Sequence, residues 1–121
     1  MGRSRYNAGD IVVVPFPVPG RNPASLSIAI ILLSWPFGPR AYHYLLCFVD
    51  PESSSDPYQM RIGAADLIAG ELNQDVFIRP TYVMTVSESR IENQLGRLSP
   101  GTLRCVIDEL ADALYEDLEE Q

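Results

Sequence analysis

The side chains of this chain that could do chemistry are few and of distinct types. All nine basic residues are arginines, His43 is the single histidine, and three serines stand in a row from Ser53 to Ser55. A guanidinium can bind phosphate through two parallel hydrogen bonds, and a histidine or a hydroxyl can transfer a proton. These types are suited to phosphate chemistry. A genome-wide preference for arginine codons would produce the same composition, so the partner stays open.

Metal and nucleotide chemistry find no support in the sequence. One histidine and two distant cysteines, Cys47 and Cys105, cannot form a typical zinc shell. No glycine-rich phosphate loop occurs. We therefore expect neither a metal nor a cofactor. Both cysteines lie in apolar contexts, which favours two buried thiols in a reducing compartment over a disulfide.

The net charge of −7 argues against nucleic acid only until its distribution is considered. Seven of the sixteen acidic residues lie between Asp108 and Glu120, so the preceding 107 residues hold nine acids against nine bases. The body of the protein is therefore neutral, and the acidity belongs to its C-terminal end.

Short β-type runs separated by turn residues must position these side chains. Val76, Ile78, Tyr82, Met84 and Val86 are expected to share one face of the last run, and Pro80 to mark a bend or an edge. Residues 64–72 have weak helical character. The expected strands are 11–14, 27–34, 42–49 (antiparallel to 27–34), 58–62 and 76–86.

The C-terminal segment has the clearest pattern. Ser99 is a good N-cap and Pro100 suits the first helical position. Apolar residues then recur at helical spacing, with acids on the opposite side. Because acids near a helix C-terminus oppose the macrodipole, we expect fraying after about Tyr115. The apolar positions are Leu103, Val106, Ile107, Leu110, Leu114 and Leu118.

Many short strands and one terminal helix predict a mainly β domain: a small SH3-like antiparallel β-barrel of five to seven strands with a C-terminal amphipathic α-helix. We expect residues 1–121 to form one domain, with 1–7 and 116–121 flexible. No apolar run reaches the roughly 20 residues that a membrane span needs, and no signal peptide is evident. A cytoplasmic location is the expectation.

Three segments together resemble the PemK/MazF family of type II toxin–antitoxin ribonucleases. The first is Gly9 to Pro17, which is similar to the family's opening strand and the start of its first loop. The second runs from Val76 to Pro80 and on to Met84-Thr85-Val86 and Arg90-Ile91. The third is Leu95 to Pro100, leading into the terminal helix. Their order and spacing cover nearly the whole chain.

The resemblance implies an SH3-like barrel that forms a homodimer and inhibits growth by metal-independent cleavage of single-stranded RNA. It also implies an antitoxin whose peptide segment occupies the RNA groove. The family's catalytic arginine falls on Ile28, and its catalytic threonine or serine falls on Val49. Neither side chain can move a proton or stabilise charge on a phosphorane. Whether the chain is an enzyme is therefore open.

Other residues are candidates to replace the lost pair. Arg21 stands in Gly20-Arg21-Asn22-Pro23-Ala24, which mimics the family's Arg-Pro-Ala motif a few residues early. His43 and Ser53 are the further catalytic candidates. A solvated arginine, a packed histidine and a flexible serine loop are the structural alternatives. The candidate groove residues are Phe16, Arg21, Trp35 and Arg79. The structural alternatives are packing for the two aromatic residues and an ion pair for Arg79.

Three hypotheses follow for function. The chain is a ribonuclease toxin with relocated groups, or a catalytically silent relative whose groove binds an antitoxin-like peptide, RNA or another protein. The third is a toxin that acts by protein binding, as gyrase-poisoning relatives of this fold do, and it rests on fold analogy alone.

Overall fold

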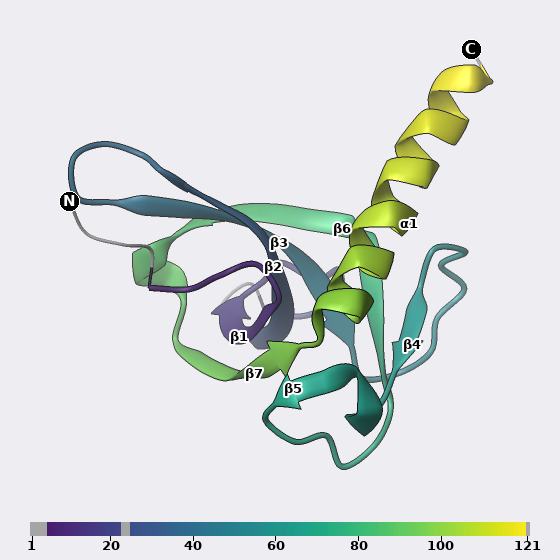
Figure 1. Ribbon diagram of the computed structural model, residues 1–121, viewed down its shortest axis with the longest axis horizontal. Helices are drawn as coiled ribbons and strands as arrows, with labels where there is room; N and C mark the ends of the chain where they lie inside the picture. The colour runs from purple at the N-terminus through teal and green to yellow at the C-terminus, as the bar shows by residue number, and fades with distance from the viewer. Residues whose placement is uncertain (1–4, 23–24, 121) are drawn as a thin grey trace.

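Seven antiparallel strands and one long helix form the part of the chain that the computed structural model describes, residues 5–22 and 25–120 (Figure 1). The strands are β1 (Asp10–Pro15), β2 (Leu26–Pro36), β3 (Tyr42–Asp50), β4 (Met60–Ile62), β5 (Leu67–Ala69), β6 (Val76–Ser87) and β7 (Asn93–Leu98). Two 3₁₀ turns, η1 (Ala64–Asp66) and η2 (Glu88–Arg90), and the helix α1 (Pro100–Glu119) complete the fold. The strands expected at 11–14, 27–34 and 42–49 are confirmed, as is the antiparallel pairing of the last two.

The two edge strands of the curled sheet are neighbours in the sequence. Its strand order is β4-β6-β3-β2-β1-β7-β5, so β4 and β5 are the edges. Only Gly63 and η1 separate them, and five extended residue steps span at most roughly 18 Å. The two edges are therefore held near each other without pairing. The expected mainly β fold with a terminal helix is confirmed, with the strands in a curled half-barrel instead of a closed barrel.

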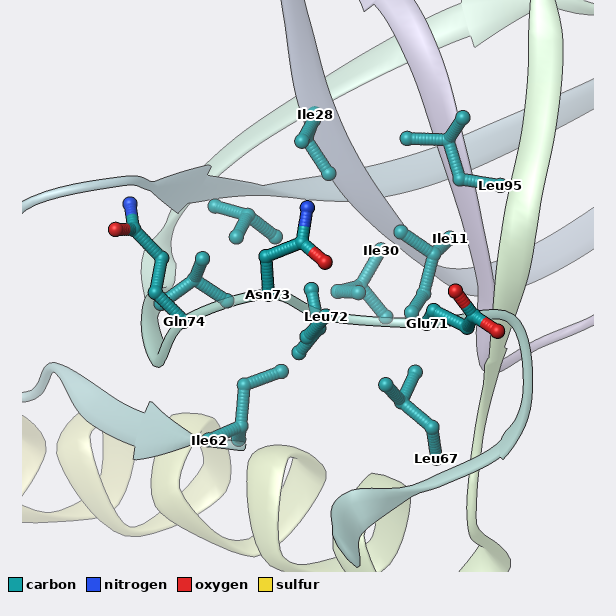
Figure 2. Close-up of a pocket in the computed structure, with 12 residues that line it drawn as sticks. Ile11, Ile28, Ile30, Ile62, Leu67, Glu71, Leu72, Asn73, Gln74 and Leu95 are labelled. Atoms are coloured by element: carbon teal, nitrogen blue, oxygen red, sulfur yellow. The ribbon is translucent and has the colours of Figure 1, made fainter. Parts of the chain in front are cut away.

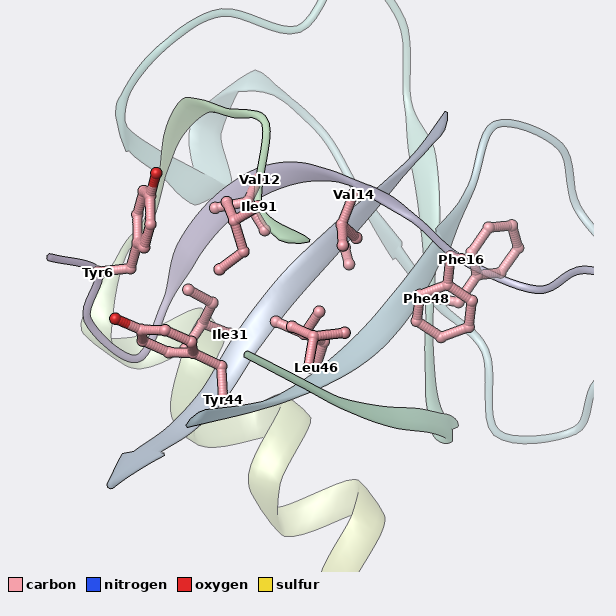
Figure 3. Close-up of a cluster of buried hydrophobic side chains, with 11 residues drawn as sticks. Tyr6, Val12, Val14, Phe16, Ile31, Tyr44, Leu46, Phe48 and Ile91 are labelled. Atoms are coloured by element: carbon pink, nitrogen blue, oxygen red, sulfur yellow. The ribbon is translucent and has the colours of Figure 1, made fainter. Parts of the chain in front are cut away.

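The sheet buries apolar side chains on both faces, because residues alternate between the faces along each strand. The inner cluster gathers within the curl (Figure 3) and contains Tyr6, Val12, Val14, Phe16, Ala29, Ile31, Tyr44, Leu46, Phe48, Val86 and Ile91. The outer cluster lies between the sheet and α1 and contains Ile11, Ile30, Leu32, Cys47, Val49, Ile62, Val76, Ile78, Leu98 and Val106.

A bulge in β6 corrects the expected sharing of one face. Phe48 pairs with Arg79, whereas Cys47 pairs with Val83, so three residues of β6 around Pro80 have no counterpart in β3. This irregularity confirms the bend at Pro80, and it turns the strand over. Val76 consequently packs in the outer cluster, while the second half of β6 packs in the inner one.

Helix α1 begins as expected and ends later. The Ser99 hydroxyl accepts a hydrogen bond from the Thr102 backbone N–H at 3.2 Å, and Pro100 occupies the first turn. Val106 and Ala113 are buried against the body of the protein. The helix continues to Glu119, beyond Tyr115, after which we expected fraying, and Figure 1 shows its final turns rising away from the sheet. The flexibility expected for residues 1–4 and 121 lies outside the described residues.

The expected helix over 64–72 is wrong. Only η1 is helical there, and β5 follows it at once because Leu67 and Ala69 pair with β7. Long-range pairing thus overrides a weak local preference. Asp66 anchors the turn: its carboxylate accepts hydrogen bonds from the Gly63 N–H at 2.9 Å and the Thr102 hydroxyl at 2.9 Å.

The two cysteines are both free thiols but differ in exposure. Cys47 is buried, and burial raises the pKa of its thiol to about 12. Cys105 is exposed on α1, so the expectation of two buried thiols is wrong for this residue. An apolar sequence context did not distinguish a sheet interior from the outer side of a helix.

Candidate functional site

The two positions on which the resemblance placed a catalytic pair face each other in the sheet. Ile28 of β2 and Val49 of β3 are cross-strand partners, which places their side chains side by side. Val49 is buried and Ile28 is partly buried. Neither offers a hydrogen bond, a charge or a proton. The structure therefore joins the expected positions into one site whose chemistry is aliphatic.

This pair lines a pocket of about 410 Å³, here called the aliphatic pocket. Figure 2 shows it between the sheet and the segment that leads from β5 toward β6. Eight aliphatic side chains besides Leu72 form its wall, and polar side chains stand only where the segment passes the opening, at Glu71, Asn73 and Gln74. The aliphatic residues are Ile11, Ile28, Ile30, Val49, Ile62, Leu67, Val76 and Leu95. A volume and lining of this kind are typical of a binding pocket for an apolar group.

A smaller hollow of about 190 Å³ adjoins the aliphatic pocket. The two share Ile28, Val49 and Val76, so those three residues belong to the lining of both. Arg21 lines the smaller hollow. The loop before β2 thus brings one guanidinium beside Ile28 and Val49, although the backbone of that loop lies outside the sheet.

Arg21 is the single catalytic candidate that the structure places at this site. Its backbone N–H donates to the Val18 carbonyl at 3.1 Å, which closes a turn, and its side chain is exposed. Pro23 and Ala24, which complete the resemblance to Arg-Pro-Ala, lie outside the described residues. No described acid forms an ion pair with Arg21, so its charge is free for a ligand.

His43 lies far from the aliphatic pocket. It is six residues before Val49 along β3, a separation of roughly 20 Å at about 3.3 Å per residue. The Phe37 ring stacks on it with centroids 4.2 Å apart and planes at 13°, and Trp35 meets it edge-on at 6.1 Å. His43 and Trp35 therefore belong to an aromatic group at the end of the β2–β3 hairpin and do not meet Arg21.

Ser53 and Arg79 are engaged elsewhere. The Ser53 hydroxyl accepts a hydrogen bond from the Gln59 amide at 3.2 Å within the loop between β3 and β4. Arg79 donates from Nε to Asp56 at 2.8 Å, and its guanidinium lies 5.0 Å from the Tyr82 ring centroid. Burial alone raises the pKa of Asp56, but hydrogen bonds from Arg79 and the Tyr58 N–H, together with the Arg79 charge, hold it below its ordinary value. Arg79 thus has the ion pair that the sequence offered as its alternative role.

Phe16 belongs to the core. It is 1% exposed and packs against Phe48 and Tyr82, with ring centroids 5.4 and 5.3 Å away. No face of its ring is open to a base, so of the two roles considered for Phe16 the structure shows packing.

Two other classes of site find no support in residues 5–22 and 25–120. No group of three or more histidine, cysteine, aspartate or glutamate side chains there is placed to hold a metal ion. No helix in the same ranges has both the length and the apolar character needed to cross a membrane.

The segment 70–75 is the part of the site that the sequence did not reveal. It has no regular structure, and it crosses the outer face of the sheet with Leu72 turned inward (Figure 2). Its position depends on Gly70, whose φ of +85° favours glycine, and on the approach of Gly70 to the backbone of Leu95 and Gly96. A glycine followed by an aliphatic residue was the sole signal, and it is too common to identify a pocket wall.

Comparisons with known proteins give one result that bears on this site. No protein-family model matches the chain, and no curated protein matches its sequence. Among solved structures, the chain is similar to an endoribonuclease in complex with its cognate antitoxin from mycobacterial species. The TM-score is 0.63 at 14% identity, over 88% of this chain and 92% of that one. The likeness therefore extends over nearly the whole chain, and what it shows is a shared toxin-like fold.

Proposed function

We propose that this protein is a PemK/MazF-like member of a toxin–antitoxin system that binds an antitoxin-like peptide and does not cleave RNA at the family's catalytic positions. The observation that carries the proposal is the Ile28–Val49 pair at the floor of an open aliphatic pocket. The shared fold of the mycobacterial endoribonuclease, which was solved with its antitoxin, supports a peptide as the partner.

The chemistry of the pair favours binding over catalysis. Removing one preorganised donor from a site that stabilises developing charge costs on the order of a hundred- to a thousandfold in rate. Two such losses multiply to at least about 10⁴-fold if they act independently. An aliphatic lining, in contrast, favours burial of an apolar side chain by roughly 25 cal/mol for each Å² removed from water.

The first test is cleavage of a long single-stranded RNA in EDTA by the purified protein. We expect no cleavage by the parent chain. A double variant, Ile28→Arg with Val49→Thr, restores the family pair and is expected to gain cleavage if the rest of the groove is retained. Cleavage by the parent would refute the proposal.

Peptide binding supplies the second readout. A random 12-residue peptide library displayed on phage is enriched on the parent protein, and the enriched clones are then tested on two variants. Ile28→Asn places an amide in the pocket, and Leu118→Asn makes the same kind of change at an exposed site on α1. Loss of capture by Ile28→Asn alone supports the pocket. If both variants lose capture equally, or if neither loses it, the pocket is not the peptide-binding site.

A relocated ribonuclease is the second candidate, and it has one observation in its favour. Arg21 lines the hollow whose floor includes Ile28 and Val49. If the parent cleaves RNA and Arg21→Ala does not, the catalytic site has moved to Arg21, and single-stranded RNA is the partner.

The family resemblance also leads us to propose a cytoplasmic homodimer. Sedimentation equilibrium of the purified chain measures the assembly, and fractionation of expressing cells measures the location. A monomer at all concentrations, or recovery outside the cytoplasm, would contradict these two points.

A further inference from the structure

The aliphatic pocket and the hollow beside it share part of their lining, and each has one charged side chain in that lining; together they are here called the groove. Ile28, Val49 and Val76 line both cavities, which have volumes of about 410 and 190 Å³. Arg21 lines only the smaller one, and Glu71 lines only the larger one. The two charged side chains therefore belong to different cavities of the groove.

Neither end charge is satisfied within the protein. The described ion pairs are Arg61–Asp75, Arg79–Asp56 and Arg97–Asp10. Arg21 and Glu71 form none within the described ranges, and both side chains are exposed. At the Arg21 end, the Ser27 hydroxyl is also buried without a hydrogen-bond partner among the described residues. An anionic group arriving there would meet a free guanidinium, which is costly to leave unpaired once water is excluded.

The larger cavity also has a side chain that can both donate and accept a hydrogen bond, Asn73. Figure 2 shows the Asn73 side chain pointing from segment 70–75 toward Ile28, with Glu71 beside Ile11. Within the described chain this amide makes no internal hydrogen bond. An asparagine amide both donates and accepts, as a peptide unit does. A single-stranded RNA fits less well, because no aromatic ring lines the larger cavity for stacking and Glu71 repels phosphate.

We infer that the groove binds an extended peptide in a fixed direction, with an aliphatic side chain in the pocket, an acidic residue at Arg21 and a basic residue at Glu71. This inference rests on the proposed peptide-binding function and specifies the peptide's chemistry. The aliphatic anchor supplies most of the affinity. The two exposed charges set direction and specificity, as charged groups at the rim of an interface do.

The test uses pairs of nine-residue peptides with identical composition. Each has a central leucine, with aspartate before it and lysine after it, or the reverse, at spacings of two, three or four residues. A serine at the centre gives the control peptide. Binding is followed by amide ¹H–¹⁵N shifts of Ile28, Val49 and Leu72, from which Kd is obtained.

We expect one order to bind roughly three- to tenfold more tightly than the other at the best spacing, the range given by two exposed ion pairs. Arg21→Ala and Glu71→Ala should each reduce that preference without abolishing the shifts. The double variant Arg21→Glu/Glu71→Arg should bind the opposite order more tightly. Both side chains are exposed, so these variants are expected to fold.

The outcomes separate this inference from the proposed function. Shifts at Ile28 and Val49 with equal Kd for both orders overturn the directional groove and leave peptide binding in place. An unchanged preference in the charge-reversed variant overturns it as well. Absence of shifts with every leucine peptide overturns both.

Discussion

The ion pair between Asp10 and Arg97 should contribute far more to stability than an ion pair of the same length on the surface. It joins β1 to β7, the two strands that carry Ile11 and Leu95 into the wall of the aliphatic pocket. Arg97 Nε lies 2.7 Å from Asp10 Oδ1, and the two side chains are 42% and 1% exposed. The second carboxylate oxygen of Asp10 accepts the Asn7 N–H at 2.8 Å.

Arg97→Met removes the charge and retains an aliphatic stem. Leaving a buried charge without its partner typically costs about 3–5 kcal/mol. Here water can reach the arginine side of the pair, and the Asn7 N–H still satisfies one oxygen. We therefore expect a loss of about 2–3 kcal/mol in the free energy of unfolding.

Arg61→Met is the matched control. Arg61 Nε lies 2.7 Å from Asp75 Oδ2, the same distance, but the side chains are 71% and 44% exposed. A pair so exposed contributes under about 1 kcal/mol. In urea unfolding followed by circular dichroism, with an m-value on the order of 1.5 kcal/mol/M, the midpoint should fall by more than about 1 M for Arg97→Met and by less than about 0.7 M for Arg61→Met.

Two further measurements test whether burial is the cause of the larger effect expected for Arg97→Met. Salt at about 0.5 M should reduce the effect of Arg61→Met and leave most of the effect of Arg97→Met, because exposed pairs are screened more strongly. Adding Asp10→Asn to Arg97→Met should recover part of the lost stability, since the buried charge is then removed. Equal midpoint shifts in the two single variants would refute the role of burial.

Two other predictions concern the thiols and the acid range. Cys105 should react with a thiol reagent in the folded protein. Cys47 should react only on unfolding, because it is buried and its pKa is raised to about 12. Fast labelling of two thiols under native conditions would contradict this prediction. Because the folded-state pKa of Asp56 is lowered, its stabilising contribution is present above its unfolded pKa of about 3.9 and is lost as the pH falls through the folded value. The difference in urea midpoint between the parent and Asp56→Asn should therefore shrink from about pH 6 to about pH 3, and a constant difference would contradict the assignment.

Local pattern was sufficient for the elements whose stability is local. The β-branched runs at 11–14 and 27–34 and the cap at Ser99 and Pro100 all lie where the sequence placed them. Each of these signals depends on residues that are near one another in the chain. The prediction of a helix at 64–72 failed for the opposite reason. The structure of this segment comes from pairing with β7 and from the hydrogen bond between Asp66 and Thr102 at the start of α1.

The pairing of Ile28 with Val49 could not be predicted from the hairpin pattern alone. These two positions came from the family resemblance. Pro36 pairs with Tyr42, and continuing that register without interruption would place Ile28 opposite Asp50. A register shift between Ile31 and Leu33 places Ile28 opposite Val49 instead. A β-bulge of this kind inserts one residue into one strand and is not signalled by alternation of apolar residues. Without it, a carboxylate would face the floor of the pocket.

The same bulge allows β2 and β3 to join a segment that is distant in sequence in forming one aliphatic site. With Val49 in register, β2 and β3 present a floor of aliphatic side chains, and Leu72 and Leu67 close the opposite wall from a segment fixed by Gly70 and by Asp66. Ile28, Val49 and Leu72 line one pocket, and an apolar group that displaces water from its aliphatic lining would be stabilised there. The pocket is thus built jointly by β2, β3 and segment 70–75, and this joint construction is the basis of the proposal that it binds an apolar group.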